Sequence, residues 1–350
     1  MFFENVACVR CGRALAYVAE IGDLVSLDPA GGHRWTSPVA PSGRPFQLCA
    51  NYTLHHVCNW AFPTGGQGSD GRLELCSACK LTRTIPNLSR DGNARRWYKL
   101  EVAKRRLVYT LEQLGLSYAS KLEDPAGGLA FEFLEDPAPG TGAPSVLTGH
   151  DGGVITVNIS EADDVARVRH REELHEPYRT LLGHFRHEAG HYYWAQLICG
   201  SSRIDGFRAL FGDERADYQA ALQRHYQNGP AAGWEERCVS AYATMHPWED
   251  WAETWAHYLH MVDALETAAA CGISLEPLRN DEPTMKKVHD PAAGEQLSFE
   301  RMISRWTAIT YVLNNLNRGL GTDDAYPFVV SALSVEKLRF VHETIASAGA

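Results

Sequence analysis

The feature that most constrains the fold is the stretch 181–194, which reads Leu-Leu-Gly-His-Phe-Arg-His-Glu-Ala-Gly-His-Tyr-Tyr-Trp. It contains His187-Glu188-x-x-His191. Two histidines four residues apart on a helix project from one face about one turn apart, so their imidazoles can converge on a single tetrahedral metal ion. The spacing therefore predicts a helix with a metal-binding face, whose remaining apolar positions lie mostly in the core.

The flanking residues suggest where this helix begins and ends. Pro177 suits a first helical turn and Gly200 suits the position after the last one. Gly190 lies within the motif and costs roughly 1 kcal/mol relative to alanine, so we expect it to allow close approach of a neighbouring element or of substrate. Glu188 is placed to take a proton from a metal-activated water and pass it to a leaving amine. The alternative is an amphipathic helix with incidental histidines.

Length and charge narrow the class of protein. The 350 residues can bury a large core and are enough for two domains. No run approaches 18 apolar residues, and residues 1–5 lack the basic and apolar regions of a signal peptide, so we expect a cytoplasmic protein with no membrane partner. The net charge of −10 is divided into +4 for the first hundred residues and −14 for the rest. The acidic part argues against a nucleic-acid substrate.

Six of the nine cysteines precede residue 80. In a reducing cytoplasm, zinc explains this clustering better than disulfides do. Cys8-x-x-Cys11 and Cys76-x-x-Cys79 each form a turn whose thiolates can hold one side of a zinc ion, and Gly12 supplies the positive φ that such a turn needs. The two pairs predict a zinc ribbon of short strands, in which a structural zinc replaces a hydrophobic core.

Cys49 and Cys58 admit two interpretations. They could form half of a second zinc site together with His55 or His56, or they could be buried thiols.

Beyond the ribbon, helical patterns predominate. They cover residues 93–114, 213–227, 234–244 and 247–271, whereas β patterns cover 129–134 and 154–159. We therefore predict an α+β protein with a ribbon domain over residues 1–90 and a mainly helical domain with a small β-sheet over residues 91–350. Strand 154–159 shortly precedes the motif helix, and we expect it to pair with an extended substrate backbone.

A hydrolytic zinc site needs a third protein ligand and an open position. The predicted helix 247–271 offers Glu249 and Glu253, which lie one turn apart on one face. One could bind the metal while the other orients a metal-bound histidine through its free ring N–H. His257 and His260 are alternative ligands, but His257 lies about two turns beyond Glu249, and packing or solvent exposure explains it better.

The motif followed downstream by Glu-x-x-x-Glu resembles the gluzincin arrangement, specifically the compact kind that includes lethal-factor-type toxin proteases. This resemblance implies a mainly helical zincin domain of mini-gluzincin type, with Glu249 as the metal ligand and Glu253 as the residue that orients the ligands. It also implies a tyrosine seven residues before the ligand, where Tyr242 stands. A phenol there would hydrogen-bond the oxyanion, which is worth on the order of 3 kcal/mol for comparable donors.

Nearly the whole chain is similar to the bacterial family of putative zinc-binding metallopeptidases that carry an N-terminal zinc ribbon. The stretches that carry this similarity are Phe2-Phe3-Glu4-Asn5, Leu81-Thr82-Arg83-Thr84-Ile85-Pro86, Glu176-Pro177-Tyr178-Arg179-Thr180, Gly183 to Trp194 and His246 to His260. Family members usually have a further C-x-x-C pair before the first stretch, with which this chain begins. The number of zinc ions in the ribbon therefore stays open.

Together these patterns predict a zinc metallopeptidase that acts on a peptide or protein. His187, His191 and Glu249 would hold one catalytic zinc, and the ribbon would hold at least one structural zinc. Two alternatives remain: a zinc-stabilised binding or scaffold protein that does not cleave, and a ribbon that binds nucleic acid or protein. The presence of Glu188 weighs against the first, and the charge of +4 permits the second only weakly.

Overall fold

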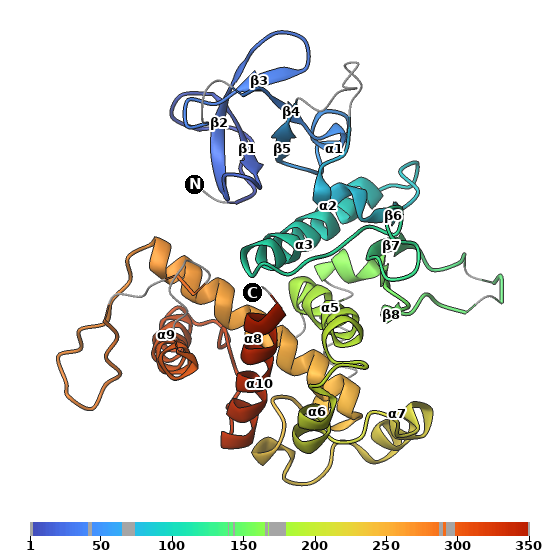
Figure 1. Cartoon of the computed structure of the whole chain (residues 1–350), viewed down its shortest axis with the longest axis vertical. Helices are drawn as coiled ribbons and strands as arrows, with labels where there is room; N and C mark the ends of the chain where they lie inside the picture. The colour runs from blue at the N-terminus through green and yellow to red at the C-terminus, as the bar shows by residue number, and fades with distance from the viewer. Residues whose placement is uncertain are drawn as a thin grey trace. The chain divides into compact units, whose positions relative to one another are not determined.

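The computed structural model describes residues 3–40, 44–64, 74–138, 140–142, 144–164, 167, 180–286, 290–291 and 298–348. The chain forms two compact units, one of residues 1–113 with 117–166 and the other of residues 114–116 with 167–350 (Figure 1). The first contains the cysteine-rich strands and a small mixed sheet, and the second is helical. The predicted α+β class is confirmed. The boundary between the compact units follows residue 166, whereas the predicted domain boundary follows residue 90.

The cysteine-rich segment folds into a closed five-stranded barrel. Its strands are β1 (Ala14–Val18), β2 (Asp23–Pro29), β3 (Arg34–Thr36), β4 (Phe46–Leu48) and β5 (Trp60–Pro63). Consecutive strands are antiparallel, and β1 closes the barrel by pairing parallel with β5. The buried apolar side chains inside it are Ala16, Val18, Val25, Leu27, Phe46, Leu48 and Ala61. The expectation that zinc would replace a hydrophobic core is therefore wrong, because the barrel has one.

A second sheet follows the barrel in the same unit. Its order is β6 (Thr82–Thr84), β7 (Ala130–Leu134), β9 (Val154–Asn158) and β8 (Gly149–Asp151). Strands β6, β7 and β9 are parallel, and β8 is antiparallel to β9. The predicted strand 154–159 is therefore present, but its expected role is wrong: β7 and β8 pair with its two sides, so its backbone is not open to substrate. The two edge strands of the sheet are β6 and β8.

Helix α3 (Asn93–Gln113) agrees with the predicted helix 93–114 and presents a buried apolar face. Its buried apolar residues are Trp97, Leu100, Ala103, Leu107, Val108 and Leu111, which recur at helical spacing. The helix lies in the same unit as the barrel and contacts the short 3-10 turn η2 (Ile159–Ala162) that follows β9.

The second unit is built on α5 (Leu181–Leu197) and α8 (Pro247–Ala270), which pack against each other (Figure 1). Helix α5 begins later than predicted, because the Thr180 hydroxyl caps it by accepting the N–H of Gly183 at 2.9 Å. Pro177, the predicted first residue, lies outside the described residues. Helix α8 begins as predicted, with Pro247 in its first turn and His246 as its N-cap.

Gly190 sets the distance between these two helices. A Cβ added to it would lie 2.9 Å from Cα of Ala252 and 3.2 Å from Cβ of Trp255. The Gly190 carbonyl also accepts the indole N–H of Trp251 at 2.9 Å. The predicted role of Gly190 in close approach of a neighbouring element is confirmed.

The other helices of this unit are α6 (Ile204–Phe211), α7 (Tyr218–Asn228), α9 (Phe299–Gly319) and α10 (Ala332–Ala348). The predicted helix 234–244 is wrong, because this stretch forms only the 3-10 turns η3 (Trp234–Glu236) and η4 (Tyr242–Thr244). In this stretch, side chains form hydrogen bonds with backbone groups that a helix would pair with each other. Lys337 donates to the Arg237 carbonyl at 2.7 Å, and Ser240 Oγ accepts the Ala243 N–H at 3.2 Å. Within the described residues, no helix combines the length and the apolar character needed to cross a membrane.

Candidate functional site

The three predicted ligands of the catalytic metal come together in the second unit. His187 and His191 on α5 and Glu249 on α8 place their ligand atoms within 4.8 Å of one another. Nε2 of His187 lies 2.9 Å from Oε2 of Glu249, and Nε2 of His191 lies 3.4 Å from Oε1. All three residues are buried. Two imidazoles and one carboxylate are a donor set that fits zinc with an open fourth position.

Glu253 lies on the other side of the His187 ring. Its Oε1 is 2.7 Å from Nδ1 of His187, and its Oε2 accepts the Ser240 hydroxyl at 2.6 Å. Burial raises the pKa of Glu253, but the hydrogen bond to His187 and the charge of that residue outweigh burial and bring the pKa to about 2. The ionised carboxylate holds the proton on Nδ1 of His187 and so leaves Nε2 to face the metal position.

The charges of the site suit a cation. Burial lowers the pKa of His187, but hydrogen bonds to Glu249 and Glu253 outweigh it and hold that pKa well above its ordinary value. Burial raises the pKa of Glu249, yet the two histidines bring it well below its ordinary value. The site therefore attracts positive charge, and a metal ion would replace the proton on Nε2 of His187.

Glu188 and Tyr242, the two predicted catalytic residues, lie beside these ligands. The rings of Tyr242 and His187 have centroids 6.0 Å apart. Burial, and to a lesser extent the charges of Glu249 and Glu188, raises the pKa of Tyr242 well above its ordinary value. Its hydroxyl therefore keeps its proton at neutral pH and can donate a hydrogen bond.

Tyr218, at the start of α7, is a residue of the site that sequence reasoning missed. Its hydroxyl donates to Oε1 of Glu249 at 3.0 Å. Burial and the charge of Glu249 raise the pKa of Tyr218, so it too keeps its proton. The sequence does indicate where α7 begins, because Asp217 is a typical N-cap residue and its carboxylate accepts the Ala220 N–H at 3.0 Å. It does not indicate that the start of α7 lies next to Glu249.

The two alternative ligands on α8 have other partners. Nδ1 of His257 lies 2.6 Å from the Tyr326 hydroxyl in a buried contact, and Nδ1 of His260 contacts Arg186. Neither belongs to the group of His187, His191 and Glu249.

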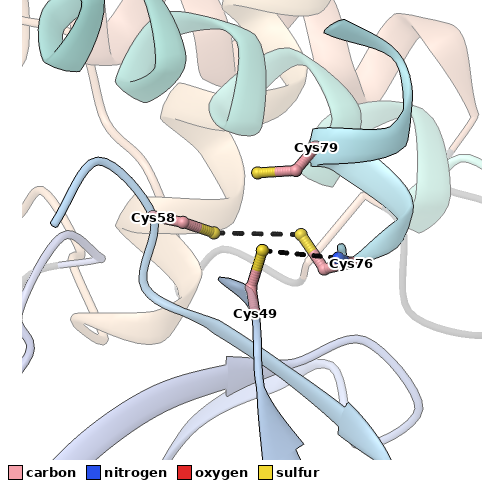
Figure 2. Close-up of side chains that lie close together, drawn as sticks. All are labelled: Cys49, Cys58, Cys76 and Cys79. Carbon is pink, nitrogen blue, oxygen red and sulfur yellow. Dashed lines mark hydrogen bonds between the residues drawn. The ribbon is translucent and has the colours of Figure 1, made fainter. Parts of the chain in front are cut away.

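A second candidate metal site lies at one end of the barrel. Cys49, Cys58, Cys76 and Cys79 point toward one another (Figure 2), and their sulfurs lie within 4.8 Å of one another. Backbone N–H groups of Trp60 and Cys76 donate to the sulfurs of Cys58 and Cys49, each at 3.4 Å. Burial and the three neighbouring cysteines raise the pKa of Cys76 well above its ordinary value. Four thiolates so close need a cation between them, and four cysteines are a typical structural zinc site.

The predicted grouping of the cysteines is therefore wrong. Cys8 and Cys11 do not join Cys76 and Cys79; Cys49 and Cys58 do. The reason is the barrel: β4 and β5 are antiparallel partners with Leu48 opposite Ala61, so the residues just after β4 and before β5 meet at one end. The helix α2 (Ser77–Lys80) brings the remaining pair there, and the Ala50 N–H donates to the Glu74 carbonyl at 2.7 Å.

Cys8 and Cys11 form the predicted turn but lie elsewhere. The Gly12 N–H donates to the Cys8 carbonyl at 2.8 Å, and Gly12 has a φ of 72°. Cys11 is exposed and Cys8 is half-buried. His55 and His56 are also exposed and outside the cysteine cluster.

A buried ion pair on α3 lies next to the cysteine cluster. Nζ of Lys104 is 2.8 Å from Oε2 of Glu101, and neither side chain is exposed to solvent. Glu101 also accepts the Thr82 hydroxyl of β6 at 2.8 Å and lies 4.0 Å from the sulfur of Cys79. The pair therefore connects the cysteine cluster to the first strand of the second sheet.

Comparison with known proteins identifies the family. Residues 93–344 match the family described as "Putative zinc-binding metallo-peptidase", and residues 1–90 match a zinc-ribbon domain. The chain belongs to this metallopeptidase family. Proteins of Mycobacterium bovis and Mycobacterium tuberculosis, each named as an uncharacterized protein, are 44% identical over 345 residues, which cover 98% of this chain and 91% of each relative. No solved structure matches. Membership of a zinc-binding peptidase family agrees with both candidate sites and makes a peptide or protein the expected substrate.

Proposed function

We propose that the protein hydrolyses peptide bonds as a zinc metallopeptidase of the gluzincin type. The observation that carries this proposal is the convergence of His187, His191 and Glu249, with Glu188 and Tyr242 beside them. Zinc bound there would supply a Lewis acid that activates water and polarises the scissile carbonyl. The cysteine cluster would hold a structural zinc, and its reduced thiols suit a reducing compartment such as the cytoplasm.

Three residues of the chain would divide the remaining chemistry. Glu188 takes a proton from the attacking water and delivers it to the leaving amine. The hydroxyl of Tyr242 donates a hydrogen bond to the carbonyl oxygen of the substrate as negative charge develops on it, a contribution of about 3 kcal/mol for comparable donors. Glu253 holds the His187 ring in the tautomer that the site needs, through the 2.7 Å contact with Nδ1.

The substitution Glu188→Gln tests this assignment, because glutamine keeps the shape of the side chain and cannot accept the proton. We expect the variant to bind as much zinc as the wild type and to lose peptide hydrolysis by about 10²- to 10⁴-fold. Cleavage would be followed by mass spectrometry on a peptide library made from a bacterial proteome. Glu236→Gln, on the exposed turn η3, is the matched control and should cleave normally. Full activity in Glu188→Gln would refute the mechanism.

A further inference from the structure

The segment that precedes α7 is hydrogen-bonded to the start of α8. His246, the N-cap of α8, has its Nε2 3.0 Å from the carbonyl oxygen of Ala216. The Tyr218 ring packs against the His246 ring, with centroids 5.3 Å apart, and its hydroxyl donates to Glu249. The element that carries Glu249 therefore also fixes the position of Tyr218.

The two oxygens of Glu249 have different surroundings. Oε2 lies 2.9 Å from Nε2 of His187, whereas Oε1 lies 3.4 Å from Nε2 of His191 and also accepts the Tyr218 hydroxyl at 3.0 Å. Carboxylates that bind metals are usually hydrogen-bonded themselves, and that bond fixes how they face the metal. Tyr218 therefore fixes the orientation of Glu249 relative to the two histidines.

Tyr218 also interacts with Tyr242. Both tyrosines are close to Glu249, whose charge raises the pKa of each of them. Tyr218 donates its only phenol proton to Glu249. A second side chain of α7, His225, packs edge-on against the Tyr242 ring, with centroids 5.8 Å apart. Helix α7 therefore contacts both Glu249 and Tyr242.

We propose that Tyr218 is a positioning residue of the metal site. Its hydroxyl holds the Glu249 carboxylate in the orientation in which one oxygen faces His187 and the other faces His191. This inference rests on the proposed function. Its first consequence concerns metal binding alone, so the test needs no substrate.

The experiment compares wild type, Tyr218→Phe and Tyr242→Phe with zinc in the cysteine cluster and Co²⁺ in the histidine site. Tyr218→Phe keeps the ring that packs on His246, so the metal-free variant should melt at the wild-type temperature. We expect it to bind Co²⁺ about 10-fold more weakly in competition with a chelator. We also expect its visible cobalt spectrum to change, because a Glu249 that has lost this hydrogen bond can turn and alter the coordination. Tyr242→Phe should leave both measurements nearly unchanged, because the hydroxyl that donates to Glu249 is that of Tyr218.

Wild-type affinity and an unchanged cobalt spectrum in Tyr218→Phe would overturn the inference and reduce Tyr218 to a packing residue. The spectrum is recorded as a difference against His187→Ala/His191→Ala, so that only this site contributes. Once a cleaved peptide is known, Tyr218→Phe should lower kcat more than it changes KM. An absence of peptide cleavage by the wild type would count against the proposed function, and the metal-binding comparison would still decide the role of Tyr218.

Discussion

The contact between α5 and α8 gives a sharp prediction, because Gly190 lets the two helices that carry His187, His191 and Glu249 approach closely. In Gly190→Ala the new Cβ would lie 2.9 Å from Cα of Ala252, which is backbone and cannot rotate away. The helices must therefore move apart by several tenths of an ångström. Forcing one carbon into a packed core costs about 1–3 kcal/mol.

The helical propensity of alanine partly offsets this cost. Alanine is favoured over glycine in a helix by about 1 kcal/mol, so the net destabilisation should be about 0–2 kcal/mol. In a unit of this size, that corresponds to a fall of up to roughly 8 °C in melting temperature. Because His187 and His191 lie on one helix and Glu249 on the other, zinc affinity at the histidine site should fall as well.

Calorimetry of the metal-free and zinc-loaded proteins measures both effects. Gly319→Ala is the matched control, since Gly319 is also helical and an added Cβ there meets nothing within 4 Å. It should be neutral or stabilise the protein by up to about 1 kcal/mol. If Gly190→Ala raised the melting temperature as the control does, the close contact between the helices would not exist as described.

Three further predictions concern the two metal sites. His187→Ala/His191→Ala should lose one zinc per chain and keep the zinc of the cysteine cluster, as measured by metal analysis of folded protein; loss of no zinc would mean that the histidine site does not bind it. Tyr242→Phe should lower kcat by about 10²-fold with little change in KM, and an effect confined to KM would remove the residue from oxyanion stabilisation. Cys58→Ser should release the zinc of the cluster and lower the melting temperature, whereas Cys11→Ser should not release that zinc; the reverse result would restore the original grouping of the cysteines.

The sequence predicted the histidine site well because its members occupy helical spacings. His187 and His191 are four apart, as are Glu249 and Glu253, and a helix converts that spacing into a shared face without knowledge of the fold. Their assignment as ligands remains a prediction that the metal analysis will test. What spacing could not supply was contact between elements, and so Tyr218, 31 residues before Glu249, was missed.

The cysteine cluster shows the same limit. Cys76 and Cys79 were paired correctly by their local motif, but their partners depend on how a barrel closes. Cys49 and Cys58 flank two apolar runs that pair antiparallel, and this register brings them together. Helix 234–244 failed for a related reason, since Lys337 binds a backbone carbonyl of that stretch from about 100 residues away.

The position of β6 limits where the chain can be cut without damage to the second sheet. Strand β6 begins at Thr82, shortly after Cys79, and supplies the outer parallel partner of β7. A fragment that begins at residue 91 would lack β6 and would expose the edge of β7, which is prone to aggregation. It would also leave Lys104 and Glu101 without the Thr82 hydroxyl. The ribbon and the sheet should therefore be exchanged between relatives as one block, and a shortened protein for crystallisation should retain both.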